Sequence, residues 1–276
     1  MMIRLVPLAL AAVATFVTNA AHAETCRFSG STSHDGHLAV RIEIAEADGL
    51  TTVDVTLEFK VSAWISEYRY LGQEISTWRG GDLVSLAVNQ RSFSGGGVVR
   101  QQWDVFTRHG DTLVASRVQA KRLAEFRQRH PGFVRHWAAG DFGQRWLADY
   151  AAAAPERRPD LDLPASGVTT PFAFVFYWSR FLPSNGMNAT VVLPGFKQNK
   201  LTRLAFGPAT AGDGWNRWAT PLRHPGLDGS PPSLAAAWVS PDGYLLQLGM
   251  DVSTAWAAGR ATLHADGCTG VQIRPG

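Results

Sequence analysis

The stretch Leu38-Ala39-Val40-Arg41-Ile42-Glu43-Ile44 decides the fold class, together with Val53-Asp54-Val55-Thr56-Leu57-Glu58-Phe59-Lys60, which follows it closely. Larger apolar side chains occupy every second position in both stretches, and this period of two places them on one face of a β-strand. Asp48-Gly49 lies between the two stretches and is a residue pair typical of a tight hairpin turn. The sequence therefore predicts an antiparallel hairpin with one buried face and one polar face.

The same kind of pattern continues on both sides of this hairpin. Glycine-containing turns such as Arg79-Gly80-Gly81-Asp82 separate the next segments, and connections this short exclude the long crossovers that parallel strands need. Further strands are expected at 67–78, 83–91, 98–108, 112–117, 172–178, 191–193, 201–206, 235–239, 245–252 and 261–265. The predicted fold is mainly β: a large, curved antiparallel sheet, built from one or two meanders and half-barrel-like, with a helical insertion.

The insertion is expected at 118–158, where β-branched residues almost disappear and Ala, Arg and Gln take over. One helix is predicted over Gln119–Arg129, and a second over Phe142–Ala154 with Asp141 as its N-cap. Lys and Arg outnumber Asp and Glu in this segment. This excess of basic residues fits an insertion that covers the sheet and exposes its outer face to solvent. Alternatively, a cationic face meets an anionic membrane surface or an acidic partner through Lys121, Arg122, Arg127, Arg129 and Arg135.

Residues 1–23 have the features of a secretory signal peptide. Arg4 precedes an apolar run, Leu5–Val17, and Ala21-His22-Ala23 provides a small-x-small cleavage site, so cleavage is expected between Ala23 and Glu24. The apolar run is shorter than the roughly 20 residues of a membrane-spanning helix. We therefore expect a soluble periplasmic protein, 24–276, that forms a single β-rich body: a first meander at 24–117, the insertion at 118–158 and a second β region at 159–276.

Only two cysteines are present, Cys26 near the predicted mature terminus and Cys268 near the end of the chain. Exported proteins keep their disulfides, so we expect a Cys26–Cys268 clasp, with a bridge between two molecules as the alternative. The cysteines are expected to lie just before the first strand and just after the last. Such a clasp would place the two β regions in one closed body.

The search for catalytic and cofactor motifs is negative. The sequence contains no Gly-x-Ser-x-Gly elbow, no His-Glu-x-x-His pair and no P-loop, and His34-Asp35-Gly36-His37 fits a solvated turn better than a metal site. The net charge is only +3, and no basic run with interleaved aromatic residues occurs, which argues against a nucleic-acid partner. No catalytic residue, metal or cofactor is predicted.

Aromatic and basic side chains in three segments are the candidates for ligand binding. The segment 172–178 is densely aromatic, the second predicted helix carries aromatic residues one turn apart, and the Gly- and Pro-rich stretch 207–232 is expected to be a loop with Trp and Arg. The alternative is that the loop's two Trp side chains plug the sheet while its Arg residues are solvated. The candidates are Trp146, Tyr150, Phe172, Phe174, Phe176, Trp215, Arg217, Trp218, Arg223 and His224.

Two hairpin-like stretches carry a resemblance to known proteins. Tyr68-Arg69-Tyr70 with Glu74 and Trp78-Arg79-Gly80-Gly81-Asp82-Leu83, and later Trp238–Leu248, resemble uncharacterised exported β-meander proteins of proteobacteria, known as domain-of-unknown-function families. The resemblance covers part of the chain and leaves out the helical insertion. It implies an exported, sheet-rich protein and no catalytic residues. At the level of the fold, a curved sheet with a helical plug also resembles periplasmic lipoprotein carriers.

These observations favour binding over catalysis. We expect a non-catalytic periplasmic protein that holds an apolar or amphiphilic, lipid-like envelope molecule between the concave face of the sheet and the helical segment. The alternatives are a periplasmic hydrolase or lyase acting on glycan, and a structural or interaction module of the cell envelope without a ligand.

Overall fold

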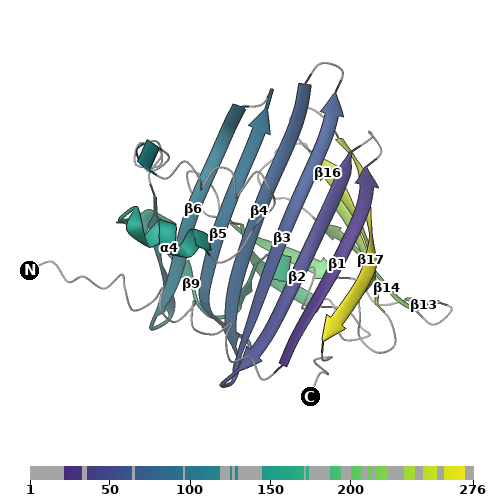
Figure 1. Cartoon of the computed structure of the whole chain (residues 1–276). Coiled ribbons are helices and arrows are strands. Elements are labelled where there is room, and N and C mark those ends of the chain that lie inside the picture. The colour runs from purple at the N-terminus through teal and green to yellow at the C-terminus, as the bar shows by residue number, and fades with distance from the viewer. Residues whose placement is uncertain are drawn as a thin grey trace, which may run out of the picture.

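A computed structural model describes residues 22–32, 36–63, 66–95, 97–118, 125, 128–129, 145–170, 172–173, 187–193, 200–206, 210–212, 215–222, 233–239, 245–253 and 258–270. A 14-stranded sheet dominates this part of the chain, in the order β13-β14-β15-β16-β17-β1-β2-β3-β4-β5-β6-β7-β8, with β9 also paired to β7 (Figure 1). All its described pairs are antiparallel, and none of them joins β13 to β8, so the sheet is open.

The first meander confirms the strands predicted between 38 and 117, and it adds β1, where no strand was expected. Its turns form where expected: Asp48 and Gly49 have φ of 53° and 70°, and Gly80 has φ of 61°. This left-handed conformation favours Gly and tolerates Asp, which explains these residues at hairpin tips. The strands are β1 (His22–Thr32), β2 (His37–Ala47), β3 (Leu50–Ala63), β4 (Ser66–Arg79), β5 (Asp82–Ser94), β6 (Gly97–His109) and β7 (Thr112–Arg117).

Strands from the second β region join the same sheet through the pairing of β1 with β17. Short strands at the far edge follow β7 in the chain and pair with it. The remaining strands of the large sheet are β8 (Glu156–Arg157), β9 (Leu163–Pro164), β13 (Thr210–Gly212), β14 (Trp215–Leu222), β15 (Ser233–Val239), β16 (Leu245–Ser253) and β17 (Ala258–Gly270). Strands β13 and β14 pair with each other as a hairpin inside 207–232, where the sequence predicts a loop. Strand β14 also pairs with β15, so the predicted loop is wrong at these strands.

The disulfide between Cys26 and Cys268 is present, with an S–S distance of 2.00 Å and a sequence separation of 242 residues. The two residues face each other directly in the register of β1 and β17. They therefore lie inside the paired strands, and not outside the first and last strand as the sequence led us to expect. The covalent bridge and the strand pairing close the same long loop.

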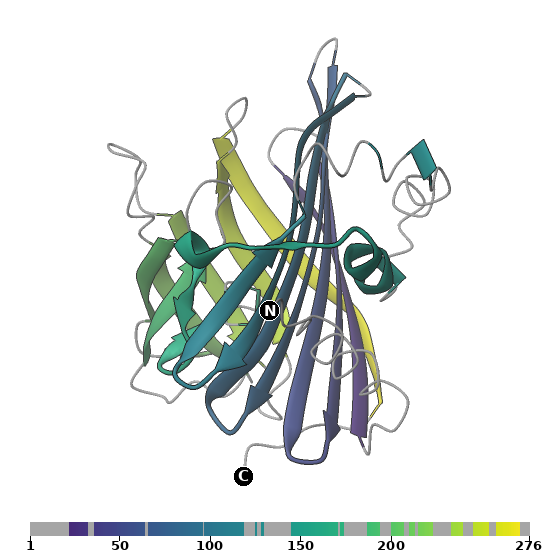
Figure 2. The same cartoon turned by 90° about the vertical axis from the view of Figure 1, so that its left-hand side faces the viewer.

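A second, three-stranded sheet lies behind the large one in Figure 1 and beside it in Figure 2, on the side toward which β14–β17 curve. It consists of β10 (Val168–Thr169), β11 (Met187–Leu193) and β12 (Lys200–Phe206), with β10 parallel to β11. Between β10 and β11, Phe172 and Ala173 are helical, so the strand predicted over 172–178 is wrong at these positions. The rest of that segment lies outside the described residues.

Helical structure is short in the described part of the chain. The predicted helix over Phe142–Ala154 is confirmed as α4 (Arg145–Ala152), and a 3-10 turn, η1 (Pro159–Leu161), follows it. Glu125, Gln128 and Arg129 are helical, and the other residues of the predicted helix Gln119–Arg129 lie outside the described residues. No helix in the described part of the chain is both long and apolar enough to cross a membrane.

The two faces of the large sheet carry separate hydrophobic clusters. We call the face with Val53 and Val55 concave, because the large sheet curves toward that side (Figure 2). The three-stranded sheet packs against this face through Val191 and Val192. We call the opposite face, with Ile75, convex; Leu147 and Tyr150 of α4 pack there. Figure 2 shows α4 and the three-stranded sheet on opposite sides of the large sheet. The described helix thus covers the convex face, which corrects the expectation that it closes the concave one.

Packing on both faces of the large sheet explains where the strict alternation of buried and half-buried residues is lost. In β3, buried and half-buried residues alternate from Val53 to Phe59, as expected for a strand with one wet face. In β4, every residue from Leu71 to Trp78 is buried, because elements pack on both faces of this strand. Polar residues of β4 to β6 are therefore buried without an alternating pattern to signal it.

Candidate functional site

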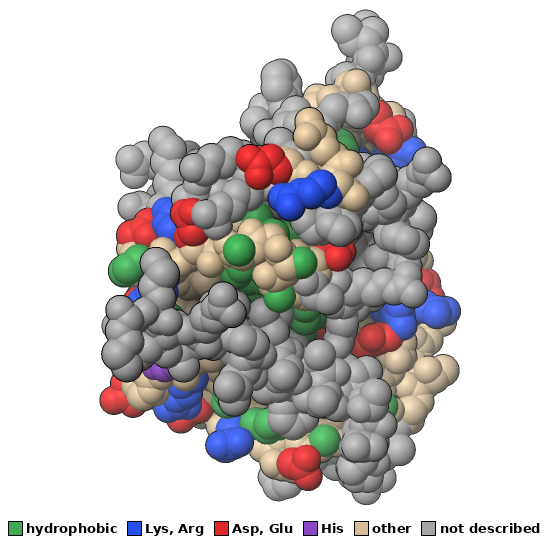
Figure 3. Space-filling model, turned by 60° about the vertical axis from the view of Figure 1, so that its left-hand side comes forward, with side chains coloured by type: hydrophobic (Ala, Val, Ile, Leu, Met, Phe, Trp, Pro, Cys, Tyr) green, Lys and Arg blue, Asp and Glu red, His purple; other side chains and the backbone are tan. Residues whose placement is uncertain are grey.

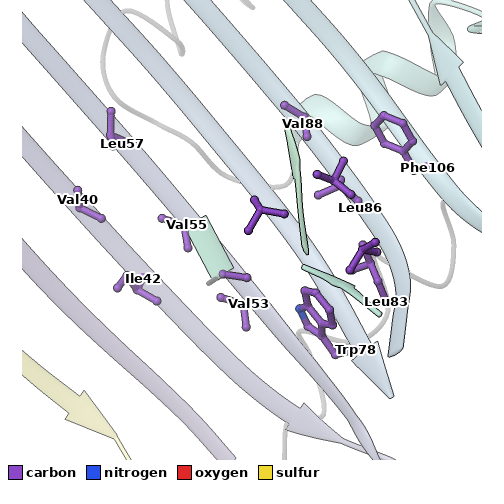
Figure 4. Close-up of a cluster of buried hydrophobic side chains, with 14 of the residues drawn as sticks. Val40, Ile42, Val53, Val55, Leu57, Trp78, Leu83, Leu86, Val88 and Phe106 are labelled. Carbon is purple, nitrogen blue, oxygen red and sulfur yellow. The ribbon is translucent and has the colours of Figure 1, made fainter. Parts of the chain in front are cut away.

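The concave face is apolar where β2 and β3 cross it. Alternating residues of both strands point into the concave cluster, and each of them is at most 8% exposed. Figure 4 shows Val40 and Ile42 of β2 beside Val55 and Leu57 of β3 on this face. The set consists of Leu38, Val40, Ile42, Ile44, Val53, Val55, Leu57, Phe59 and Val61.

The same face becomes polar where β4 to β7 cross it. The register aligns Val55, Glu74, Val88, Asp104 and Arg117 in one row across five strands. The adjacent row contains Gln90 on β5 and Gln102 on β6, opposite each other. We call Glu74, Gln90, Gln102, Asp104 and Arg117 the concave polar group. The concave face therefore has an aliphatic half and a polar half, which meet between β3 and β4.

Glu74 connects the sheet to the chain segment that enters the concave side. Its carboxylate accepts hydrogen bonds from the hydroxyl of Thr170 and, at 3.2 Å, from the backbone N–H of Ala173. Both bonds end on Oε1, and the backbone of Phe172 also donates to this carboxylate. Burial raises the pKa of Glu74 to about 7, opposed by the hydrogen bond from Thr170. Glu74 thus anchors Thr170 and Ala173 to the middle of β4.

Asp104 and Arg117 form a buried ion pair at the other end of this row. Arg117 donates from Nε to Oδ1 at 2.5 Å and from a terminal nitrogen to Oδ2 at 2.7 Å, and Gln102 donates to Oδ2 at 2.6 Å. Burial raises the pKa of Asp104, while the forked hydrogen bonds from Arg117 oppose that shift. Backbones two strands apart are separated by about 10 Å, so Glu74 and Asp104 form no direct pair.

A second set of polar residues is buried on the convex face. Gln73 donates from Nε2 to both carboxylate oxygens of Asp54, at 2.8 and 2.9 Å, and burial raises the pKa of Asp54 to about 7. The Arg91 guanidinium carbon lies 5.6 Å from the centre of the Trp103 ring, within the range of a cation–π contact. Asn89 lies between Gln73 and Trp103 in the register and is fully buried.

Sequence reasoning missed both polar sets. Asp54 belongs to the alternating pattern of β3 and is half-buried there, and the pattern does not show that the buried amide of Gln73 on β4 donates to it. The strands β4 and β5 gave no alternation from which burial of Glu74 or Asn89 could be read. The one usable signal was their position in central strands of a predicted meander, where polar side chains are uncommon.

Among the predicted ligand-binding residues, Tyr150 and Phe172 lie on opposite faces of the sheet. Tyr150 is buried on the convex side, where its hydroxyl donates to Ser116 Oγ at 2.9 Å, and burial raises its pKa. Phe172 is half-buried and packs against the concave cluster. These two residues therefore do not line one common site. Phe174, Phe176, Arg223 and His224 lie outside the described residues.

The other predicted site residues are placed by their backbone. Trp146 lies on α4, and Trp215, Arg217 and Trp218 lie on β14, where Arg217 pairs with Trp238 and Trp218 with Ala237. Their part in ligand binding stays a prediction.

The predicted signal cleavage site lies within β1. Ala23 pairs with Ala45 and Glu24 with Ile44, one and two residues after the strand begins at His22. Cleavage between Ala23 and Glu24 would remove two residues of β1 and leave the rest of this strand, with Cys26, in place. The cleavage itself stays a prediction.

Charges of both signs are mixed on the described surface. Figure 3 shows blue and red side chains next to each other around one face, with hydrophobic groups between them. Of the predicted cationic face, Arg129 is described: it is exposed and lies 3.8 Å from Glu125. Lys121, Arg122, Arg127 and Arg135 lie outside the described residues, so a membrane or acidic partner at this segment stays a prediction.

One group of described residues has the composition of a metal site. The ligand atoms of Glu24, Cys26 and Cys268 lie within 4.8 Å of one another. Both sulfurs are joined in the disulfide, and a disulfide sulfur is not the thiolate that metals bind. The 2.8 Å approach of Cys26 Sγ to Glu24 Oε1 is a contact and not a thiol hydrogen bond, because that sulfur carries no proton.

Comparison with known proteins shows a likeness of fold. No protein-family model matches the chain, and no curated protein matches it either. The chain is similar to the crystal structure of a beta-barrel-like protein of domain of unknown function DUF1849 from Brucella abortus. The TM-score is 0.53 at 8% sequence identity, over 91% of this chain and 98% of that one. The resemblance expected from the sequence is confirmed to this extent: the similar structure is β-rich and belongs to a domain of unknown function.

Proposed function

We propose that this protein is a non-catalytic, exported protein of the periplasm that binds an amphiphilic, lipid-like molecule on the concave face. The observation that carries the proposal is the division of this face into an aliphatic half on β2 and β3 and a polar half on β4 to β7. An amphiphile has the same division, so its chain would insert between the first half and the three-stranded sheet that packs against it, and its head group would contact the second. The signal-like segment and the disulfide support export.

Two features favour binding over catalysis at this face. Glu74 accepts hydrogen bonds from Thr170 and Ala173, and Asp104 accepts them from Arg117 and Gln102. Both carboxylates are thus engaged in holding the protein together, which argues against the pair of reactive acids that glycan hydrolysis needs. Gln90, which is half-buried in the polar half, offers an amide donor and an amide acceptor to a phosphate or carbohydrate head group.

The experiment is native mass spectrometry of the full chain, expressed with its own signal and purified from the periplasm, followed by solvent extraction. We expect a mass adduct and a copurified amphiphile. Gln90→Leu removes an amide from the polar half and should reduce the occupied fraction, whereas Thr56→Val on the convex face should not. A clean apo mass, with no extracted lipid, would indicate a ligand-free structural module instead.

A further inference from the structure

The chain just before β10 has a fixed point followed by a residue that can act as a hinge. Ala165 is fully buried; its N–H donates to the Asp111 carbonyl at 2.9 Å, and its carbonyl accepts from the Leu83 N–H at 3.2 Å. Gly167, two residues later, is exposed and has φ of 69°, a left-handed conformation that Gly adopts without strain. A Cβ atom at Gly167 would have no other atom within 4 Å, so packing does not enclose the backbone there. The three-stranded sheet therefore begins directly after a residue that can absorb a change in chain direction.

Glu74 of β4 holds the chain directly beyond β10. Its Oε1 accepts from the Thr170 hydroxyl and, at 3.2 Å, from the Ala173 N–H, and that N–H also lies 3.3 Å from the Thr170 hydroxyl oxygen. We call these three residues the Glu74 tether. The hydrophobic contact of the three-stranded sheet with the concave face runs through Val191 and Val192. The tether thus adds a polar attachment, at one end of β10, to a hydrophobic contact.

Thr169 shows that the closed arrangement of the two sheets leaves a polar group uncompensated. Its side chain is 7% exposed, and its Oγ1 has no hydrogen-bond partner among the described residues. A buried hydroxyl without a partner has lost its water without compensation. If β10 moves away from the large sheet, water reaches this hydroxyl. The closed arrangement therefore lacks a hydrogen bond that an open arrangement regains.

The charged and titratable groups around Glu74 can be named for the described residues. In the row across the sheet, the neighbours of Glu74 on β3 and β5 are valines. Farther along this row, Asp104 and Arg117 form an ion pair with each other, so their charges compensate. Tyr70 lies on the same face of β4 and is uncharged between pH 5 and pH 8, and residues 170–173 have no ionisable side chain. Among these groups, the charge that changes near neutral pH is that of Glu74.

The direction of the pH effect follows from burial. Burial raises the pKa of the Glu74 carboxyl from 4.5 to about 7 while the sheets are closed, against the hydrogen bonds from Thr170 and Ala173. Once water reaches this carboxyl, its pKa returns toward 4.5. Protonation therefore favours the closed arrangement. This stabilisation is complete below pH 4.5 and is lost as the pH rises through 7.

We propose that the Glu74 tether is a pH-sensitive switch: protonated Glu74 holds the three-stranded sheet closed, and ionised Glu74 lets it rotate about Gly167 away from the concave face. This proposal rests on the amphiphile function proposed above and adds a step which that function needs. The aliphatic side chains of β2 and β3 are at most 8% exposed, so an alkyl chain reaches them only when the sheet that covers them moves. A more alkaline solution opens this path and a more acidic one closes it.

Hydrogen–deuterium exchange of the full chain, followed by mass spectrometry of peptides from β11, measures the opening without any ligand. Protection is corrected for the intrinsic rise of amide exchange with pH, and peptides from β2 are the internal reference. In the wild type, protection of β11 relative to β2 should fall about tenfold or more between pH 5 and pH 8. In Glu74→Gln, which stays uncharged and keeps an oxygen acceptor for Thr170, it should change by less than about twofold.

Two further variants test whether the tether itself is responsible. Glu67→Gln is the matched control on the same strand: Glu67 is half-exposed and pairs with Lys60, so this variant should behave as the wild type. Thr170→Val removes the hydroxyl donor of the tether and should lower the protection of β11 already at pH 5. Protection of β11 that is independent of pH in the wild type, or that falls equally in Glu74→Gln, would overturn the switch. If Glu74→Gln fails to fold, the wild-type pH profile and Thr170→Val still decide.

Uptake of a pyrene-labelled lysophosphatidylcholine, below its micelle concentration, tests what the opening controls. Stopped-flow fluorescence should show uptake by the wild type about tenfold faster at pH 8 than at pH 5, and equally slow uptake by Glu74→Gln at both. Uptake that does not depend on pH, while exchange of β11 does, would overturn the control of access. If no form takes up the probe and the exchange results are as expected, the amphiphile function fails and the switch stands.

Discussion

Replacing Glu74 by Gln should remove a defined part of the pH dependence of stability. Glu74 is 4% exposed, and burial raises its pKa from 4.5 to about 7. A raised carboxyl pKa means that the folded state prefers the protonated form. The stabilisation that protonated Glu74 gives to the folded state is therefore complete below pH 4.5, and it is lost as the pH rises through 7. The wild-type protein should become less stable as the solution is made more alkaline across this window.

The size of the effect follows from the pKa difference. Each unit corresponds to 1.36 kcal/mol, so the buried carboxylate lowers the free energy of unfolding by roughly 2–3 kcal/mol between pH 5 and pH 8. Gln is uncharged at both pH values and keeps an oxygen that accepts the hydrogen bonds from Thr170 and Ala173. The Glu74→Gln variant should therefore match the wild type at pH 5 and exceed it by about that amount at pH 8.

Urea unfolding followed by tryptophan fluorescence at pH 5, 6, 7 and 8 measures this difference. Glu67→Gln is the matched control, since Glu67 lies on the same strand, is half-exposed and pairs with Lys60 on the surface. It should leave the pH dependence as in the wild type. Equal pH dependence in Glu74→Gln and wild type would show that Glu74 is ionised in the folded protein at no cost, and the reasoning from burial would fail.

Three further changes test the parts that hold the fold together. Removing the disulfide by Cys26→Ser with Cys268→Ser should lower the free energy of unfolding by up to roughly 5 kcal/mol, which is the chain-entropy value for so long a loop. If urea unfolding shows a loss below about 1 kcal/mol, strand pairing alone holds the two ends of the chain together. Arg117→Met leaves the Asp104 carboxylate buried without its cation, with Gln102 as the remaining donor, and should cost about 3–5 kcal/mol. Adding Asp104→Leu should restore much of that loss, and a double-mutant cycle by thermal unfolding that shows no coupling contradicts the buried pair. Tyr150→Phe removes one buried hydrogen bond under α4 and should destabilise by about 1 kcal/mol in the same assay, and an unchanged melting temperature would count against that bond.

The strands and turns of the first meander were predictable because their signals are local. In β3 the alternation of Val53, Val55 and Leu57 with polar residues records one buried and one wet face, and Asp48-Gly49 adopts the left-handed turn it favours. The disulfide was predictable by elimination, since two cysteines allow one intrachain pairing. The Trp-rich stretch at 207–232 was not, because Gly and Pro indicate turns but do not say whether the residues between them pair.

The sequence by itself determined which residues form the strands after β1 in the first meander, that the fold is mainly β and that Cys26 can pair with Cys268. Tertiary structure alone decided that β1 pairs with β17, that α4 packs on the convex face and that Glu74 and Asn89 are buried. The physical reason is that alternation records burial only where one face of a strand meets water. On β4 and β5 both faces are covered by segments far away in the chain, so the environment of a polar side chain there depends on partners that its neighbours in sequence do not reveal.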